Sequence, residues 1–431
     1  MSQTIDIPTI VSAAEMGTGD RDSGRRGVAE FALSLSASLG TFVFFSVQGI
    51  LLARLLGPEM RGAFAAAVLF PQALLYLGLL GASELMAGYA ARGLPDTELR
   101  RSAARYGAFA GLLSLALCIA LDWFLLPGEF RQVLPLALLC AMTLPLQQIR
   151  LSVQAIDHGQ RNMTRYNVTR LISAAAFPLT LAIGALFGLH DIRWCCIWLV
   201  VSQVLSFLLI QWGMRGSWMG PSAVPLKSGL RDARGLIVAW LSNELLERLD
   251  VMILLLVASR ETLGFYAAAA PMAAAMIIVP NTMGLYAFNR GARIEEIPSL
   301  RDAWRFLLGA MAAQIVCAIA LGALLPIFVK VLYGKDFAQT VYFAWLLLPA
   351  GAFKGLLQAT DSYARARGKP SLGIRARLMC IPVLLAVAWG GYSYWGTYSI
   401  PIGLSLAQFV CFVLVARSVL LDVHEHARQA P

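Results

Sequence analysis

A group of charged side chains lies inside an apolar run of the sequence, between Trp240 and Asp250. Glu244 and Arg248 are four residues apart, so a helix places them on one face, and Glu247 and Asp250 share a neighbouring stripe. Ionisable groups at bilayer depth are costly and usually face a cavity or a partner. This stretch therefore predicts either a polar stripe that binds an anion or carries H⁺ or Na⁺, or a structural Glu244–Arg248 pair.

Other ionisable residues are isolated within or at the ends of apolar runs. Lys354 stands near the middle of one run, where a lone cation implies an anionic substrate or a carboxylate partner. Arg54 ends the first run, and it either contributes to an anion site or extends its long side chain to the membrane surface. The candidate substrate-binding cations are Arg248, Lys354 and Arg54. The candidate ion-coupling carboxylates are Asp250, Glu244, Glu247, Glu84 and Asp361.

The sequence contains none of the motifs that mark a soluble catalytic site. No G-x-x-x-x-G-K-[ST] phosphate loop, G-x-S-x-G elbow, H-E-x-x-H zinc motif or paired-cysteine metal motif occurs. The 7 cysteines lie in or at the ends of apolar runs without metal-ligand spacing, so we interpret them as small packing residues. We expect no enzymatic activity, no cofactor, no metal site and no nucleic-acid partner.

Composition indicates a membrane protein. Hydrophobic residues make up 58% of the chain and charged residues only 14%, whereas soluble domains carry about a quarter charged residues. About twelve apolar runs approach or exceed the roughly 20 residues that cross a bilayer. They lie near residues 28–53, 64–91, 103–121, 133–156, 167–187, 194–214, 234–257, 265–289, 303–329, 339–360, 374–394 and 399–421. The predicted fold is an all-α polytopic membrane protein with about 12 transmembrane helices.

The basic residues predict the topology. Lys and Arg are concentrated in the cytoplasmic loops of membrane proteins. If both termini of this chain are cytoplasmic, most of its 35 Lys and Arg residues lie on the cytoplasmic side, so we expect this orientation. The net charge of +10 is therefore mainly a topology signal. We expect these loops to contact anionic lipid headgroups.

A weak internal repeat divides the chain into two halves. Residues 55–67, after the first run, match residues 258–269, after the seventh, and pair Gly62 with Gly264. Because each half holds six spans, both halves enter the membrane from the same side, and the repeats are parallel. The expected parts are a disordered cytoplasmic tail over 1–26, an N-lobe with helices 1–6 over 27–215, a cytoplasmic linker over 216–232, and a C-lobe with helices 7–12 and a short cytoplasmic tail over 233–431.

Several loops resemble those of a known transporter group. Residues 53–62, Ala-Arg-Leu-Leu-Gly-Pro-Glu-Met-Arg-Gly, resemble the A-R-x-L-G-P-x-x-x-G loop after helix 1 of Wzx-type polysaccharide flippases. Arg248-Leu249-Asp250, followed by residues 263–266, resembles the R-x-D and L-G-x-Y elements around helix 7. Residues 332–337 and 364–370 resemble the loops after helices 9 and 10. These flippases belong to the multidrug/oligosaccharidyl-lipid/polysaccharide exporter superfamily, and the resemblance spans residues 28–420.

The resemblance implies a flippase of the bacterial cytoplasmic (inner) membrane. Such a protein moves a polyprenyl-pyrophosphate-linked oligosaccharide from the cytoplasmic to the external leaflet by alternating access, for surface polysaccharide synthesis. Arg54, Arg248 and Asp250 match the motifs by position, and cations suit a pyrophosphate group. The expected partners are the lipid-linked oligosaccharide, membrane lipids, H⁺ or Na⁺, and polysaccharide polymerase or export proteins. Two alternatives stay open: a cation-coupled multidrug or toxin extruder of the same fold, and a non-transporting membrane scaffold of a polysaccharide-export complex.

Overall fold

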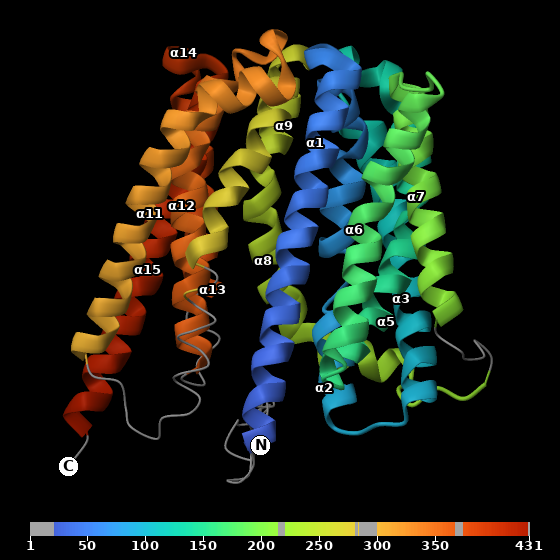
Figure 1. Ribbon diagram of the computed structural model, residues 1–431, viewed down its shortest axis with the longest axis vertical. Helices are drawn as coiled ribbons and strands as arrows, with labels where there is room; N and C mark the ends of the chain where they lie inside the picture. The colour runs from blue at the N-terminus through green and yellow to red at the C-terminus, as the bar shows by residue number, and fades with distance from the viewer. Residues whose placement is uncertain (1–20, 214–219, 281–282, 284–299, 367–373, 430–431) are drawn as a thin grey trace. The chain divides into compact units, whose positions relative to one another are not determined.

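The computed structural model describes residues 21–213, 220–280, 283, 300–366 and 374–429, and every regular element in these ranges is helical (Figure 1). The predicted all-α membrane fold is confirmed. The predicted disordered tail over 1–26 lies mostly outside the described residues, and the first helix begins at Arg21. In chain order the α-helices are α1 (Arg21–Leu77), α2 (Ala82–Ala91), α3 (Asp96–Leu125), α4 (Leu134–Ala141), α5 (Leu144–Gly159), α6 (Met163–Leu186), α7 (Ile192–Gly213), α8 (Leu226–Val257), α9 (Arg260–Ala274), α11 (Leu300–Phe328), α12 (Thr340–Ala366), α13 (Ile374–Gly390), α14 (Tyr392–Trp395) and α15 (Ser399–Gln429).

The apolar runs of the sequence correspond to these helices. Within the described residues, 9 helical segments are long and apolar enough to cross a membrane. The first of them, Ser36–Ala91, holds two predicted spans, and the apolar part of α13, Ala376–Gly390, is shorter than a full span. Helix α8 has the length of a span but is interrupted by the charged residues between Glu244 and Asp250. Wherever the structure describes the predicted spans, helices account for most of their residues, and turns interrupt them at 78–81 and 142–143.

Two compact units make up the chain, and each is described by itself. One, the N-terminal unit, covers Gly19–Ala267 and holds α1 to α8 with the first half of α9. The other, the C-terminal unit, runs from Ala268 through α15. Helix α8 packs against α1, α2 and α3, so its charged residues belong to the N-terminal unit.

A glycine kink joins the first two spans into one continuous helical segment. Gly57 has φ 68° and ψ 176° inside α1, a conformation that residues with a Cβ rarely adopt. Pro58 follows it and removes a backbone hydrogen-bond donor. The Gly57-Pro58 pair therefore redirects the chain between the two spans without a separate loop.

The second predicted span, over 64–91, is broken in the structure between α1 and α2. Polar side chains from neighbouring helices bind carbonyl groups at the break. Gln148 Nε2 donates to the Leu74 carbonyl at 2.9 Å, and the Tyr106 hydroxyl donates to the Leu80 carbonyl at 3.0 Å. A broken helix at membrane depth is tolerated where neighbours satisfy its backbone in this way. Hydrogen bonds from other helices thus stabilise the break within the N-terminal unit.

Helices α3 and α5 pack with their backbones in close approach. A Cβ atom at Gly107 would lie 2.7 Å from the Ile149 Cα, and one at Gly111 would lie 2.4 Å from the Pro145 Cα. Membrane helices commonly associate through small residues that allow such approach. Helices α3 and α5 are antiparallel in this pairing. Helix α3 also contacts α4.

The two loops paired by the sequence repeat lie against each other in the N-terminal unit. A Cβ atom at Gly62 would lie 1.7 Å from the Arg260 carbonyl oxygen, and one at Gly264 would lie 1.9 Å from the Pro58 carbonyl oxygen. Each glycine therefore packs against the carbonyl group of the residue four positions before the other glycine. Because the two contacts are equivalent, the two segments are related by an approximate two-fold axis.

The C-terminal unit is a helical bundle in which α15 packs against α12, α13 and α11. Phe353 of α12 contacts Phe409 and Phe412 of α15, with ring centroids 5.0 and 6.3 Å apart. Exposed aromatic residues mark one end of this bundle: Trp389, Tyr392, Tyr394 and Trp395. Aromatic rings of this kind collect at membrane–water interfaces.

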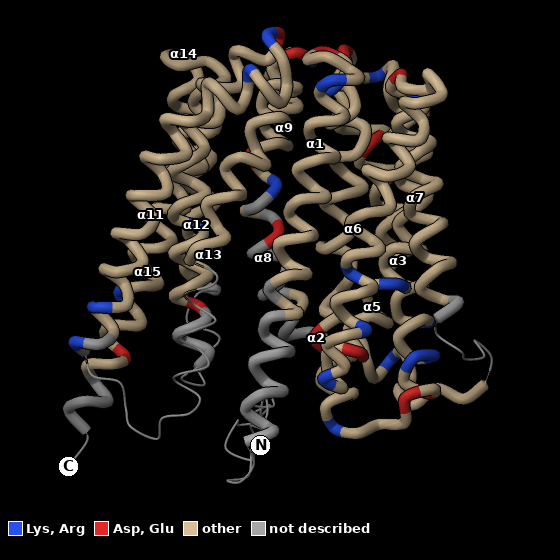
Figure 2. The backbone as a smooth tube through the Cα atoms, viewed as in Figure 1, with Lys and Arg blue, Asp and Glu red and all other residues tan. Residues whose placement is uncertain are grey.

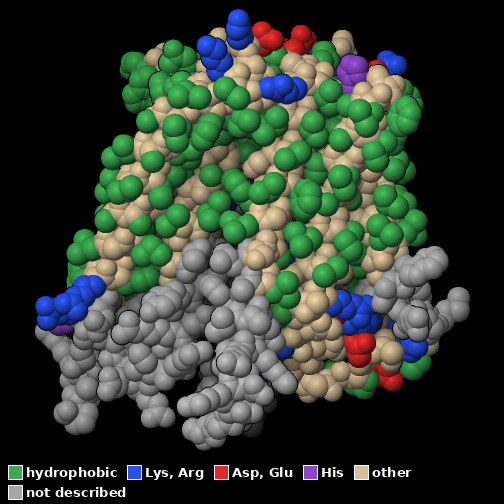
Figure 3. All heavy atoms as spheres, in the orientation of Figure 1, with side chains coloured by type: hydrophobic (Ala, Val, Ile, Leu, Met, Phe, Trp, Pro, Cys, Tyr) green, Lys and Arg blue, Asp and Glu red, His purple; other side chains and the backbone are tan. Residues whose placement is uncertain are grey.

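Charged and apolar side chains are segregated along the helices. Most of the described Lys, Arg, Asp and Glu residues lie near the helix ends (Figure 2). Hydrophobic side chains cover the lengths of the helices between these ends (Figure 3). On α11, Ile315, Val316 and Ile319 are exposed, as expected of a helix that faces lipid. Both units therefore present surfaces suited to a bilayer.

Candidate functional site

Helix α8 places two carboxylate residues in the interior of the N-terminal unit. Glu244 and Asp250 are buried, and Arg248 is partly buried. The Tyr266 hydroxyl of α9 donates a hydrogen bond to Asp250 Oδ2. This bond links the end of α8 to α9, in the segment that follows the R-x-D sequence.

The Arg248 guanidinium group is not paired with Glu244 among the described residues. None of the ion pairs that the structure shows joins these two side chains, and Arg248 Nε is buried without a hydrogen-bond partner. The side chain of Glu247 lies outside the described residues. An unsatisfied guanidinium N–H group is able to donate a hydrogen bond to an anionic ligand.

The other candidates of the N-terminal unit come from different helices. Arg54 is exposed on α1, three residues before the kink at Gly57. Glu84 is half-buried in the first turn of α2, directly after the helix break. An exposed Arg54 fits the alternative in which its long side chain extends to the membrane surface.

Lys354 and Asp361 lie on α12 in the C-terminal unit. They are seven residues apart, two turns of helix, so they occupy the same face. Asp361 forms an ion pair with Arg377 Nη2 of α13. The pair ties two helices together and favours a structural role for Asp361. Lys354 is half-buried.

The structure adds a buried arginine that the sequence analysis missed. Arg150 is only 7% exposed on α5, and its Nε and Nη1 atoms are buried without hydrogen-bond partners. In the sequence Arg150 lies near the end of the apolar run over 133–156, where a basic residue is expected in a cytoplasmic loop. The spacing of Arg150, Gln154 and Asp157 at helical intervals was the available signal for one polar face.

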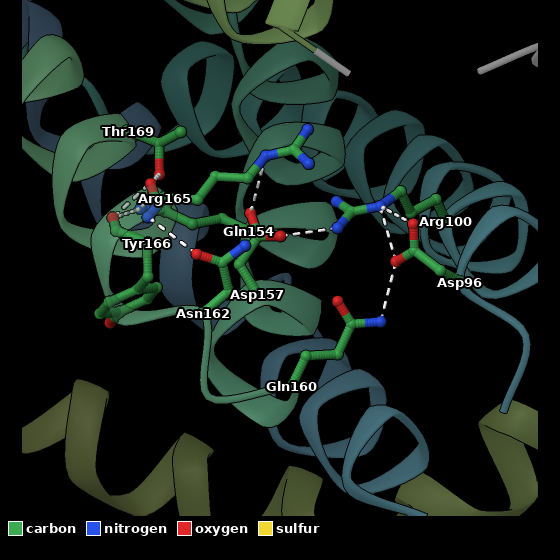
Figure 4. A network of polar contacts seen from close by, with 9 residues as sticks. All are labelled: Asp96, Arg100, Gln154, Asp157, Gln160, Asn162, Arg165, Tyr166 and Thr169. Atoms are coloured by element: carbon green, nitrogen blue, oxygen red, sulfur yellow. Dashed lines mark hydrogen bonds and ion pairs between the residues drawn. The ribbon is translucent and has the colours of Figure 1, made fainter. Parts of the chain in front are cut away.

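A polar network ties α3, α5 and α6 together at one end of the N-terminal unit (Figure 4). Asp157 is 1% exposed, and its carboxylate lies 2.6 Å from Arg100 Nη2 and 3.6 Å from Arg165 Nε. Arg100 Nε also lies 2.9 Å from Asp96, which accepts a further bond from Gln160 at 2.9 Å. Because these charges are paired with each other, the network acts as a structural clamp.

No described residues form a metal site: no group of three or more His, Cys, Asp or Glu side chains in this part of the chain could hold a metal ion.

Comparison with models of protein families identifies the family of this chain. Residues 28–287 match the model of the family described as "Polysaccharide biosynthesis protein". The chain belongs to this polysaccharide biosynthesis protein family. The match covers more than half of the chain and extends from α1 through α9. A comparison with curated proteins gave no match.

Solved structures share the fold of this polysaccharide biosynthesis protein. The lipid II flippase MurJ in an inward closed conformation matches with a TM-score of 0.72 and 13% identity, over 91% of this chain and 90% of MurJ. The eukaryotic MATE transporter AtDTX14 matches with a TM-score of 0.67 and 16% identity, over 92% and 99%. A mutant of the Vibrio cholerae MATE transporter VcmN matches with a TM-score of 0.63 and 13% identity, over 94% and 96%.

These matches confirm the predicted fold, and together with the family model they are consistent with the resemblance of the loop sequences. A MATE transporter described as a member of the MOP superfamily, the exporter superfamily indicated by the loop sequences, also matches, with a TM-score of 0.65 and 14% identity over 91% of this chain and 96% of its own. At these identities the similarity establishes the fold alone. The chain is thus a multi-pass membrane protein that shares its fold with solved flippase and transporter structures.

Proposed function

We propose that this protein is a flippase that moves a polyprenyl-pyrophosphate-linked oligosaccharide from the cytoplasmic to the external leaflet of the bacterial inner membrane. The oligosaccharide would then enter surface polysaccharide synthesis. Membership of the polysaccharide biosynthesis protein family supports this class of pathway, and the fold shared with flippases and transporters supports alternating access of two lobes. Both termini are cytoplasmic in this proposal, as the basic residues predict.

The main support for the proposal is that Arg150 and Arg248 have buried N–H groups without hydrogen-bond partners. The two guanidinium groups lie on α5 and α8 of one unit. Buried donors require acceptors, and leaving them unsatisfied costs about 1–3 kcal/mol each. A pyrophosphate group offers several charged oxygen atoms and forms short, charge-assisted hydrogen bonds with arginine. The two arginines would therefore bind the anionic head of a lipid-linked sugar.

The carboxylates of α8 support the second candidate, a cation-coupled multidrug or toxin extruder. Glu244 and Asp250 are buried in the same unit as the arginines, and several solved MATE transporters share the fold. In such an extruder these carboxylates, with Glu247 and Glu84, would exchange H⁺ or Na⁺ for the exported compound. The two candidates differ in which charges bind the cargo, so single substitutions separate them.

Substituting the candidate cations tests the flippase directly. Arg150→Ala and Arg248→Ala are each expected to lower surface polysaccharide at least about tenfold, because each removes charge-assisted bonds to the substrate of about 1.5–3 kcal/mol. The measurement is surface polysaccharide in a deletion strain that carries each variant at equal membrane level. Arg231→Ala is the matched control, because the Arg231 side chain is 73% exposed. Normal polysaccharide in both cation variants would remove these residues from the proposed site.

A further inference from the structure

Part of the predicted cytoplasmic linker over 216–232 is bound to the N-terminal unit. Helix α8 begins at Leu226, inside the predicted linker. The segment just before it, residues 220–224, lies along the first turns of α3, and each of its residues takes part in a hydrogen bond with that helix. We call residues 220–224 the strap.

Two arginines of α3 bind the first residues of the strap. Arg105 Nη2 lies 2.7 Å from the Gly220 carbonyl oxygen, and Nη1 lies 3.2 Å from Ser222 Oγ. Arg101 Nη1 lies 3.4 Å from the Pro221 carbonyl oxygen. Gly220 has φ 121°, a conformation that residues with a Cβ rarely adopt. Glycine therefore allows the chain to turn onto α3 at this position.

A buried serine of α3 binds the other end of the strap. The Val224 amide donates to Ser102 Oγ at 3.0 Å, and Ser102 Oγ donates to the Glu98 carbonyl at 3.0 Å. The Ala223 amide donates to the same carbonyl at 3.4 Å. Ser102 is 3% exposed, so its side chain is shielded from water. The contacting residues of α3 recur at positions 98, 101, 102 and 105, which form one face of a helix.

Apolar packing continues the contact into α8. Ala233 of α8 is 0% exposed and belongs to a buried cluster with residues of α2, α3 and α5. Gly229 lies against Tyr106 of α3, where a Cβ atom would be 3.2 Å from the ring. Other apolar side chains of the strap and of α8 pack against the same cluster: Val224, Leu226, Leu230 and Ile237. The start of α8 is therefore held by buried contacts as well as by hydrogen bonds.

We propose that the strap is a fixed anchor that holds the start of α8 on α3, and that it does not open as a joint between the two halves of the chain. Opening would break the hydrogen bonds of the whole strap and expose the apolar side chains that follow it. The boundary between the two compact units lies within α9 instead, between Ala267 and Ala268.

The anchor has one consequence that rests on the proposed function. Arg150 of α5 and Arg248 of α8 would remain parts of one body while the cargo crosses the membrane. The anchor itself is independent of the cargo, because it concerns contacts within the N-terminal unit alone. A measurement of distance therefore tests it whether or not the protein moves a lipid-linked oligosaccharide.

Electron paramagnetic resonance of two spin labels, on the full-length protein in bilayers of bacterial lipid, measures whether the strap opens. Labels on Thr97→Cys of α3 and Lys227→Cys of α8 occupy exposed positions outside the contacts named above. The native cysteines other than Cys317 are buried, and Cys317 is replaced by alanine. We expect one narrow distance population, as narrow as that between Thr97→Cys and His158→Cys on the packed helices α3 and α5. A broad distribution, or a second and longer distance, would overturn the proposal.

Variants of the strap contacts show whether these contacts hold α8. Arg105→Ala combined with Ser102→Ala should broaden the distance between the labels at 97 and 227, and the distance between 97 and 158 should stay narrow. Arg231→Ala is the matched control, because its side chain is 73% exposed, and it should change neither distance. If both distances broaden in the double variant, Arg105→Lys replaces it, since lysine keeps the charge but loses the forked contact. A narrow distance between 97 and 227 in these variants contradicts the anchor.

Discussion

Gly264→Ala is expected to destabilise the protein, whereas the same substitution at Gly309 is expected to stabilise it slightly. The new Cβ at Gly264 would lie 1.9 Å from the Pro58 carbonyl oxygen and 3.0 Å from the Gly62 backbone nitrogen. These are backbone atoms, so α1 and α9 must move apart. Overpacking of this kind costs about 1–3 kcal/mol or more. At Gly309 the Cβ meets nothing within 4 Å, and alanine favours the helix by about 1 kcal/mol.

Thermal unfolding of the two purified variants in the same detergent measures the difference. Gly264→Ala should unfold at a lower temperature than the unsubstituted protein, and Gly309→Ala at an equal or higher one. Gly62→Ala should behave like Gly264→Ala, because its Cβ would lie 1.7 Å from the Arg260 carbonyl oxygen. Equal midpoints for Gly264→Ala and Gly309→Ala would show that the reciprocal glycine contact is absent in the folded protein.

Arg100→Ala should also cause a large loss of stability. Arg100 binds both Asp96 and the buried Asp157, at 2.9 and 2.6 Å. Its removal leaves Asp157 with the more distant Arg165, 3.6 Å away. Breaking a buried ion pair by removing one partner costs about 3–5 kcal/mol. We therefore expect Arg100→Ala to lower the unfolding temperature and the amount of protein in the membrane.

Arg231→Ala is the matched control for this prediction. Arg231 also lies near an aspartate, 3.7 Å from Asp232, but its side chain is 73% exposed. Exposed pairs contribute about 0–1 kcal/mol, so this variant should unfold as the unsubstituted protein does. An Arg100→Ala protein as stable as Arg231→Ala would mean that the network of Figure 4 does not clamp α3, α5 and α6.

The membrane fold was predictable from the sequence because hydrocarbon imposes a simple length rule. In the described part of the chain the predicted apolar runs coincide with helices, including α8, which is interrupted by charge. The repeat was visible in the glycines, and it paired Gly62 with Gly264 before the structure brought them together. Short glycine patterns carry this information because backbone approach excludes every residue with a side chain.

The interior of the N-terminal unit was not predictable in the same way. The break between α1 and α2 depends on Gln148 and Tyr106, which are distant in sequence from the carbonyls that they bind. Arg150 and Ser102 stand near the ends of apolar runs, where the sequence cannot separate an interfacial side chain from a buried one. Their burial follows from which face of α5 or α3 points inward, and tertiary packing determines that face.

The central claim, transport of a lipid-linked oligosaccharide, is tested most directly by analysing a deletion strain for undecaprenyl-linked sugars and for surface polysaccharide. The account predicts that lipid-linked oligosaccharide accumulates and surface polymer is lost. Restoring the gene should reverse both changes, whereas the Arg248→Ala variant should not. Unchanged lipid-linked sugars together with unchanged surface polymer would contradict the flippase and favour export of drugs or toxins, which a sensitivity screen of the same strain would reveal.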